Sequence, residues 1–416
     1  MRDEFPVLSG YRLLELADEP GVLCGKVFAD LGADVLKIEA PRGGPDRERA
    51  PFAGDRRGEN TSLHFAAYNA GKRGLTLDLE REEGREIFLD LVARADFVID
   101  SYAPGVLQTL GLEYASLARA NPRIIHASVT PFGQEGPYRE FASTEMVTSA
   151  LAGLLYMVGE PGEAPVHTNF PMSVHAAAAL DAATGLLVAH HERERSGLGQ
   201  YIDVSAQEAA KWMTFDVALR WELEGAILRR AGAALEYAEG IRRRVHWRCS
   251  DGWVAFAVFP APSSYKSARS LTEWMQEEGY ETGAFGEASW EDLDYFDMSE
   301  KDILALEDPV AKFFEDRSMQ ELYDGALDRA ILLAPAMTAR EIVESPQLEA
   351  LDFWAEVADP DRGGDARYPR FLRSSEVSVG VRRRAPRLGE HNQEVYENEL
   401  GIPAERLRKL GDHGVV

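Results

Sequence analysis

The first third of the chain alternates short apolar runs with longer amphipathic stretches. The apolar runs lie at 11–16, 33–40, 74–79, 96–102 and 123–130, and the amphipathic stretches lie at 21–32 and 80–95. This alternation predicts parallel strands joined by crossover helices. We therefore expect an open α/β domain whose ligands bind at loops that follow strands, here 17–21, 39–44 and 100–105.

A longer helical pattern occupies 174–194 and runs into a glycine turn and a strand that ends at 205. Ser173 is suited to accept a backbone N–H as the N-cap. His175 then lies in the first turn, where the positive helix terminus favours a neutral imidazole. A single histidine at such a position is more often a packing or hydrogen-bonding residue than a catalyst.

The pattern of apolar and charged residues changes after this strand. A helical stretch, the basic patch GIRRRVHWR, an apolar strand at 251–259 and an acid-rich stretch at 273–308 follow one another. We expect a separate, smaller α+β domain inserted into the chain. The predicted division is 1–205 for the N-terminal part of the large domain with its long linker helix, 206–330 for the small domain, and 331–416 for a return segment that completes the large domain.

Composition narrows the class of protein. The 416 residues include 45 Lys and Arg against 70 Asp and Glu, a formal charge of −25, which argues against nucleic acid as a partner. We expect no membrane span, because no apolar run approaches the roughly 20 residues that one needs. Two cysteines and a start unlike a signal peptide predict a cytoplasmic location.

The sequence lacks the motifs of several common metal, nucleophile and dinucleotide sites. The nine histidines have no carboxylate or thiolate at ligand spacing, so we expect no metal site. No G-x-S-x-G elbow occurs, and neither cysteine has a nucleophile context. The three-glycine dinucleotide fingerprint is missing after the first strand, so Glu39 is better explained as a solvated strand-end acid than as a ribose ligand.

Seven segments carry a resemblance to a known family. They are LGADVLKIEAP (31–41), NAGKRGLTLDL (69–79), PGVLQTLGL (104–112), SVTPFGQEGPY (128–138), SGLGQYIDVS (196–205), DGWVAFAV (251–258) and PRLGEHNQEV (386–395). In this order they resemble the class III CoA-transferases, the group of carnitine, formate and bile-acid CoA-transferases that includes α-methylacyl-CoA racemase. The resemblance implies a Rossmann-like large domain, a small inserted domain and two subunits interlocked like chain links.

The resemblance also implies a chemistry. In these transferases an Asp at the head of the long helix attacks the acyl-CoA thioester, forms a mixed anhydride and then carries CoA as an aspartyl thioester. Counting back ten residues from Gly185 to the position of that Asp leads to His175. Asp181 lies six residues further on, about 240° around the helix, so it is on a different face. No catalytic residue is therefore expected in this chain.

Other family positions can be matched residue by residue. The resemblance implies CoA lying on the large domain, and it marks as candidate CoA-binding residues Lys72, Arg73, Leu77, Asp78, Ser101, Tyr102 and Gly105. Thr109 stands where the family has an arginine that helps to hold CoA phosphates. Near the nucleophile position, Glu19 stands where the formate enzymes have a glutamine, and Glu145 matches an acidic position of the family.

These matches favour a nucleophile-lacking subunit that works beside a homologous subunit carrying the catalytic Asp. The chain most resembles the corresponding subunit of the heteromeric enzymes that transfer CoA from succinyl-CoA to (R)-2-benzylsuccinate in anaerobic toluene degradation. Acyl-CoA and a dicarboxylic acid are then substrates, no cofactor is permanently bound, and whether this subunit itself binds CoA stays open. The alternatives are a racemase- or isomerase-like acyl-CoA enzyme that uses His175 as acid or base, and a non-catalytic acyl-CoA-binding scaffold.

Overall fold

The computed structural model describes residues 6–58, 60–167, 173–238, 241–294, 297–370 and 372–416. These residues divide into two compact units. Unit 1 comprises Met1–Ala152, Asn169–Met213 and Pro346–Val416, and unit 2 comprises Gly153–Thr168 and Thr214–Ser345.

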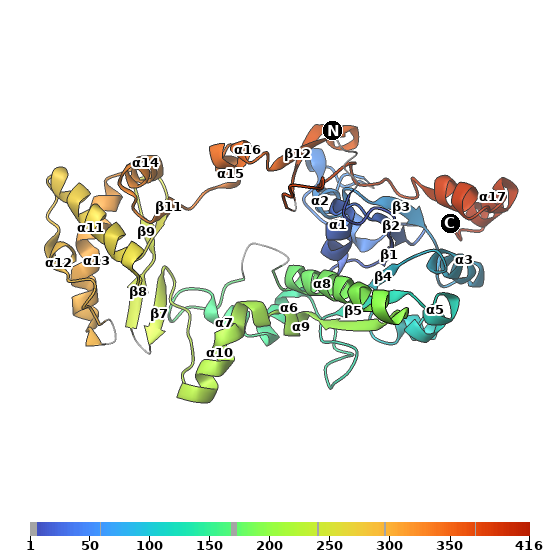
Figure 1. Cartoon of the computed structure of the whole chain (residues 1–416), viewed down its shortest axis with the longest axis horizontal. Coiled ribbons are helices and arrows are strands. Elements are labelled where there is room, and N and C mark those ends of the chain that lie inside the picture. The colour runs from blue at the N-terminus through green and yellow to red at the C-terminus, as the bar shows by residue number, and fades with distance from the viewer. Residues whose placement is uncertain (1–5, 59, 168–172, 239–240, 295–296, 371) are drawn as a thin grey trace. The chain divides into compact units, whose positions relative to one another are not determined.

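Unit 1 contains a six-stranded parallel sheet in the order β3-β2-β1-β4-β5-β6 (Figure 1). The strands are β1 (Arg12–Leu16), β2 (Asp34–Glu39), β3 (Arg73–Thr76), β4 (Phe97–Asp100), β5 (Ile125–Thr130) and β6 (Tyr201–Ser205). The α/β fold with an open parallel sheet is thus confirmed. The strand order reverses between β1 and β4, so the loops after these two strands flank the switch point where such sheets bind ligands.

Helices cover both faces of this sheet, because alternate side chains of each buried strand point to opposite faces. On one face, Leu14, Leu36 and Val98 share a core with Phe88 and Tyr396. The elements on this face include α3 (Glu82–Val92), α5 (Tyr114–Ala120), the π-helix η5 (Gln393–Glu399) and α17 (Ala404–Asp412). The other face packs against α1 (Val22–Asp30) and α8 (Ser173–Ser196), which contact each other.

Shorter elements complete unit 1. They are η1 (Pro45–Glu48), η2 (Ala53–Asp55), α2 (Leu63–Asn69), α4 (Val106–Thr109), α6 (Glu145–Leu151), α9 (Ala206–Ala209), α16 (Pro346–Ala350), η4 (Pro360–Arg362), and the antiparallel pair β12 (Trp354–Asp359) and β13 (Gly364–Pro369). The helix α10 (Lys211–Glu224) crosses from unit 1 into unit 2.

Unit 2 is built around a three-stranded antiparallel sheet in the order β11-β10-β9. Its elements are α7 (Leu154–Met157), β7 (Ala234–Ala238), β8 (Ile241–Arg244), β9 (His246–Arg248), β10 (Trp253–Phe256), α11 (Pro262–Glu277), α12 (Gly283–Glu287), α13 (Glu300–Glu315), α14 (Met319–Arg329), β11 (Leu333–Pro335) and α15 (Ala339–Val343). Its core is aromatic, with Trp247, Phe256, Trp274 and Phe313 all buried.

The segment 153–168 groups with unit 2, although the sequence places it in the 1–205 part. Arg230 is one residue that links this segment to unit 2, since its guanidinium donates to the carbonyl oxygens of Tyr156 at 3.0 Å and Glu163 at 2.9 Å. Both hydrogen bonds join a side chain to a backbone carbonyl about seventy residues away in the sequence, and no local pattern signals them. The predicted domain boundaries themselves stay a prediction.

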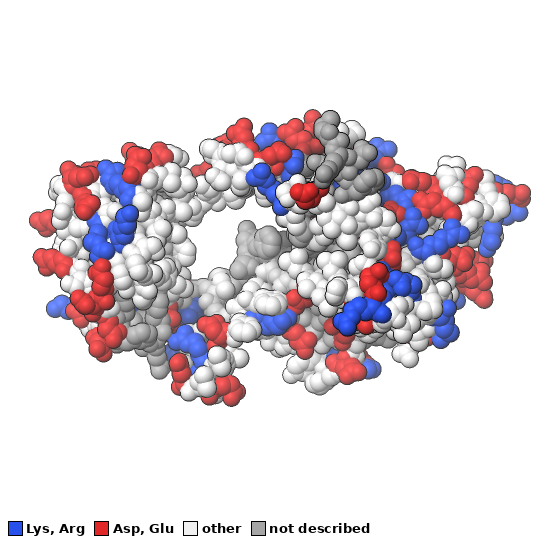
Figure 2. Space-filling view, in the orientation of Figure 1, with Lys and Arg blue, Asp and Glu red and all other residues white. Residues whose placement is uncertain are grey.

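Acidic and basic side chains alternate over the face of the molecule drawn in Figure 2. That face therefore shows no broad basic area of the kind that nucleic-acid binding requires. Within the part of the chain that the structure describes, no helix has both the length and the apolar character of a membrane span.

Candidate functional site

The head of α8 is held by Glu145 from α6. One carboxylate oxygen of Glu145 accepts hydrogen bonds from the hydroxyl of Ser173 at 2.9 Å, the backbone N–H of Val174 at 3.1 Å and the hydroxyl of Ser149 at 3.1 Å. An anionic acceptor at this point satisfies a helix N–H and matches the positive end of the helix dipole. Ser173 was expected to accept a backbone N–H, but its hydroxyl instead donates to Glu145, which caps the helix.

His175 occupies the first turn of α8 and is 5% exposed. Its Nδ1 lies 3.9 Å from Oε1 of Glu19, in the loop after β1, which is beyond hydrogen-bond distance. Neither ring nitrogen of His175, nor this oxygen of Glu19, has a hydrogen-bond partner among the described residues. The imidazole is thus buried beside a carboxylate, and its nitrogens have no partner in the part of the chain that the structure describes.

Arg49 holds the other oxygen of Glu19 in an ion pair. Burial raises the pKa of the Glu19 carboxyl, but His175 and Arg49 lower it more, so the pKa lies below its ordinary value of 4.5. Glu19 is consequently ionised at neutral pH. A carboxylate neutralised by a guanidinium is a poor nucleophile, because attack on a thioester would break that pair.

Two side chains of α2 border the same cluster. The rings of His64 and Tyr68 lie with their centroids 4.8 Å apart. Burial, reinforced by Arg49, lowers the pKa of His64, and burial raises the pKa of Tyr68. The sequence analysis missed Arg49, His64 and Tyr68, which come from a segment with no motif and reach Glu19 only through the fold.

Asp181 does not approach the head of α8. Its two carboxylate oxygens are engaged by Lys211 at 2.6 Å and by the indole N–H of Trp212 at 2.8 Å. Asp181 is six positions after His175, a separation that places the two side chains on different helix faces. Within the described part of α8, the first turn therefore carries an imidazole and no carboxylate.

A pocket of about 520 Å³ lies at the carboxyl ends of β1, β2 and β3 and beside α4. It is lined by Leu16, Ile38, Glu39, Ala40, Pro41, Arg42, Leu77, Asp78, Leu79, Glu80, Tyr102, Val106, Leu110 and Gly414. We call it the rim pocket. It brings together three of the predicted CoA-binding residues, namely Leu77, Asp78 and Tyr102. Burial raises the pKa of Tyr102 to about 12, so its hydroxyl stays protonated.

The remaining predicted CoA-binding residues lie elsewhere. Lys72 is fully buried and donates to Glu15 at 2.8 Å, Asn69 at 3.0 Å and the carbonyl of Val22 at 3.0 Å, so it has no surface to offer a ligand. Burial lowers the pKa of Lys72 to about 8 and raises that of Glu15. Both shifts are caused by burial, which outweighs the opposing effect of the ion pair between Lys72 and Glu15.

Arg73 is also inside the fold, 6% exposed. Its guanidinium pairs with Asp34 at 2.6 Å, Glu399 at 2.6 Å and Glu394 at 2.9 Å, which ties β3 to β2 and to η5. Ser101 accepts the backbone N–H of Asp18 at 2.8 Å. These two residues stabilise the fold around the rim pocket and do not line it.

Gly105 borders a second cavity of about 310 Å³, with a polar floor that the sequence did not reveal. There one oxygen of Asp100 accepts from Nε2 of His126 at 2.7 Å and from the hydroxyl of Ser128 at 2.7 Å. Serine and histidine both bond to the aspartate and not to each other, so this is not a nucleophilic triad. No group of three or more potential metal ligands occurs in the described ranges.

Comparison with known proteins gives one consistent result. The model of CoA-transferase family III matches residues 8–392. The chain is 34% identical to the succinyl-CoA:(R)-benzylsuccinate CoA-transferase subunit BbsE of Thauera aromatica, covering 98% of each protein. It is 29% identical to the succinyl-CoA–L-malate CoA-transferase alpha subunit of Chloroflexus aurantiacus, covering 98% of this chain and 92% of that one. A CAIB/BAIF family protein from Brucella suis shares its fold, with a TM-score of 0.79 at 24% identity over 95% of this chain and 100% of that one.

Proposed function

The chain belongs to CoA-transferase family III, and on this premise we propose that it is a subunit without a nucleophile, working beside a homologous subunit that carries the catalytic Asp. In this proposal the pair moves CoA from succinyl-CoA to a dicarboxylic acid such as (R)-2-benzylsuccinate, in the cytoplasm, during anaerobic degradation of aromatic hydrocarbons. The likeness to BbsE, named as a subunit of the benzylsuccinate enzyme, supports this choice of acceptor.

The observation that carries the proposal is His175 at the head of α8. A transferase of this family needs a carboxylate there to displace CoA from the thioester and become an acyl anhydride. An imidazole cannot form that anhydride. Glu19, the carboxylate beside it, is held by Arg49 and lies in the loop after β1, not on the helix.

The charges around the rim pocket support placing the productive CoA site on the partner. Its lining contains three carboxylates, Glu39, Asp78 and Glu80, against one cation, Arg42. Arg47 neutralises Glu39 through two hydrogen bonds of 2.8 and 2.7 Å, and Arg81 contacts Asp78, but neither arginine lines the pocket. CoA carries several phosphate charges, which favour converging arginines.

An exposed apolar surface on α10 supports an assembly with a second subunit. Its large side chains are 41% to 76% exposed, and they are Trp212, Met213, Phe215, Leu219, Trp221 and Leu223. Four of these side chains, Phe215, Leu219, Trp221 and Leu223, lie in the part of α10 that belongs to unit 2. Large exposed apolar side chains grouped on one helix are typical of a protein interface. We propose that the interface is with the homologous subunit, in the interlocked arrangement that the resemblance to the family implies.

The test is co-expression of this chain with the homologous subunit encoded beside it, followed by assay of CoA exchange between succinyl-CoA and aryl-substituted succinates. We expect activity only in the mixture. That activity should survive His175→Ala in this chain and be lost when the catalytic Asp of the partner is replaced by Ala. Full activity of this chain alone, or in a mixture whose partner lacks the Asp, would overturn the proposal.

A second candidate function rests on the unsatisfied nitrogens of His175. An imidazole next to the ionised Glu19 can take up and return a proton, as an acyl-CoA racemase or isomerase requires. Incubating the chain alone with a 2-substituted acyl-CoA in deuterated water distinguishes this function. Deuterium at the α-carbon that disappears in His175→Gln would support it, and no exchange would exclude it.

A further inference from the structure

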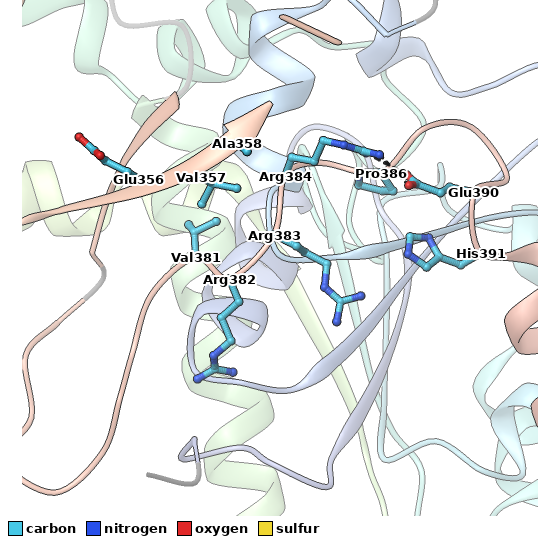
Figure 3. Close-up of a pocket in the computed structure, with 10 residues that line it drawn as sticks. All are labelled: Glu356, Val357, Ala358, Val381, Arg382, Arg383, Arg384, Pro386, Glu390 and His391. Atoms are coloured by element: carbon cyan, nitrogen blue, oxygen red, sulfur yellow. Dashed lines mark hydrogen bonds and ion pairs between the residues drawn. The ribbon is translucent and has the colours of Figure 1, made fainter. Parts of the chain in front are cut away.

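A separate pocket of about 460 Å³ lies in unit 1, away from the head of α8. One wall is β12, and the other is the segment 381–391, whose lining residues Figure 3 labels. Hydrogen bonds between His391 and Gly74 place this segment beside β3. The pocket is lined by Glu356, Val357, Ala358, Val381, Arg382, Arg383, Arg384, Pro386, Glu390 and His391. It shares no lining residue with the rim pocket. We call it the arginine pocket.

Most arginines around this pocket are neutralised by a neighbouring acid. Arg384 makes a two-point pair with Glu390, at 2.9 and 2.7 Å. Arg387 pairs with Asp361 at 2.5 and 2.8 Å. Arg367 of β13 contacts Glu356 at 3.1 Å. The two acids that line the pocket therefore already have cationic partners.

Two lining arginines, Arg382 and Arg383, form no ion pair with an acid among the described residues, and of these two Arg383 is the one that also lacks a side-chain hydrogen bond. Its side chain is exposed and makes no hydrogen bond or ion pair with any residue that the structure describes. Its neighbour Arg382 donates one hydrogen bond, to the carbonyl of Ser378 at 3.2 Å. Arg383 thus lies on the wall of the pocket without an acidic partner in the described part of the chain. Its five N–H donors are available to a ligand.

His391 supplies a second donor at the same place. Its Nδ1 accepts the backbone N–H of Gly74 at 3.1 Å, and its own backbone N–H donates to the carbonyl of Gly74 at 3.0 Å. An Nδ1 that accepts leaves the ring proton on Nε2. Burial lowers the pKa of His391; the nearby Glu390 and Glu394 oppose this shift, and Arg383 and Arg73 reinforce it. Figure 3 shows the side chains of Arg383 and His391 extending toward each other.

We propose that the arginine pocket binds a small organic anion, whose carboxylate or phosphate oxygens are held by the guanidinium of Arg383 and the Nε2–H of His391. A guanidinium offers the paired donors that both groups prefer. The pocket is far larger than one inorganic ion and falls in the size range of small-molecule sites. Val357, Val381 and Pro386 provide apolar surface for the body of the ligand. This inference goes beyond the proposed function and does not depend on it.

The test is isothermal titration of the full-length chain with inorganic phosphate, succinate and phosphoenolpyruvate. We expect at least one organic anion to bind with one-site stoichiometry, and Arg383→Gln to weaken it about tenfold, the effect of losing one charge-assisted contact. Arg406→Gln is the matched control, since it removes the same charge from an exposed arginine of α17. Preference for phosphoenolpyruvate over succinate would identify phosphate as the recognised group, and the reverse would identify carboxylate.

Three outcomes would overturn the proposal. The first is the absence of binding by all three anions. The second is binding that Arg383→Gln and Arg406→Gln weaken equally, which indicates a general charge effect. The third is an Arg383→Gln chain that binds anions normally but no longer associates with its homologous subunit, which assigns the pocket to a protein contact. Thermal unfolding of both variants without ligand verifies that they remain folded.

Discussion

Nδ1 of His175 lies 3.9 Å from Oε1 of Glu19, so the residue that we propose to occupy the family's nucleophile position is buried beside a carboxylate from the loop after β1. Arg49 holds that carboxylate in its ionised form. A second carboxylate at position 175 would therefore meet like charge in a largely buried site. Positions 19 and 175 are therefore coupled: the effect of a substitution at one position on stability depends on which residue stands at the other.

His175→Asp alone is expected to destabilise the chain by about 1 to 3 kcal/mol at pH 8, because two neighbouring carboxylates cannot both ionise freely. The double variant Glu19→Gln/His175→Asp should recover most of this loss. Repulsion raises the pKa of one carboxyl in the folded state, so the loss is greatest above that pKa and shrinks as the pH falls toward 5. Urea unfolding at pH 8 and pH 5 measures this loss of stability. Equal stability of the single and double variants at pH 8 would contradict the coupling between positions 19 and 175.

Glu145→Ala is expected to cost about 1 to 2 kcal/mol of folding stability, because it removes the anionic acceptor at the head of α8. The matched control is Glu140→Ala, a nearby exposed glutamate that pairs only with Arg139 among the described residues. Glu140→Ala should alter the free energy of unfolding by no more than about 0.5 kcal/mol. Chemical denaturation of both variants provides the comparison. Similar losses at the two positions would show that Glu145 does not cap the helix.

Arg73→Gln is expected to lower stability by roughly 2 to 3 kcal/mol at pH 7, less than for a fully buried pair since its partners are partly exposed. Burial raises the pKa values of Asp34 and Glu399, but Arg73 and Arg12 lower them more, below the ordinary 3.8 and 4.5. A carboxyl whose pKa is lower in the folded state stabilises the fold at any pH above its ordinary pKa. This stabilisation is lost as the pH falls through the folded-state pKa.

The acid-dependent part of the stability should therefore be smaller in Arg73→Gln than in the parent chain. Urea midpoints measured from pH 7 down to pH 3 test this, with the exposed Arg81→Gln as control. Parallel pH profiles for the parent and Arg73→Gln would rule out the network as the source of acid sensitivity.

Lys72→Met is expected to cost about 3 to 5 kcal/mol, because it leaves Glu15 buried without its cation. Replacing both partners, as Glu15→Gln/Lys72→Met, should recover a large part of that loss. Thermal unfolding measures the stability. A Lys72→Met chain that folds as stably as its parent, and differs only in CoA affinity, would show instead that Lys72 binds the ligand.

The fold class follows from the amino-acid sequence because it depends on patterns within short segments. Apolar runs such as 33–40 and 123–130 identify the buried strands. The spacing of apolar residues in 80–95 identifies α3 as an amphipathic helix that packs its apolar face on the sheet. The position of His175 at the head of a helix can also be obtained by counting along the chain. These features require only spacing and hydrophobicity, which the linear order contains.

The chemistry around that helix was decided by tertiary structure. The cap comes from Glu145, almost thirty residues before Val174, and the partner of Glu19 comes from Arg49. Lys72 looked like a ligand-binding cation, but the fold buries it against Glu15. Each of these outcomes depends on which charges are brought together and how far they are removed from water, and a sequence read along its length contains neither quantity.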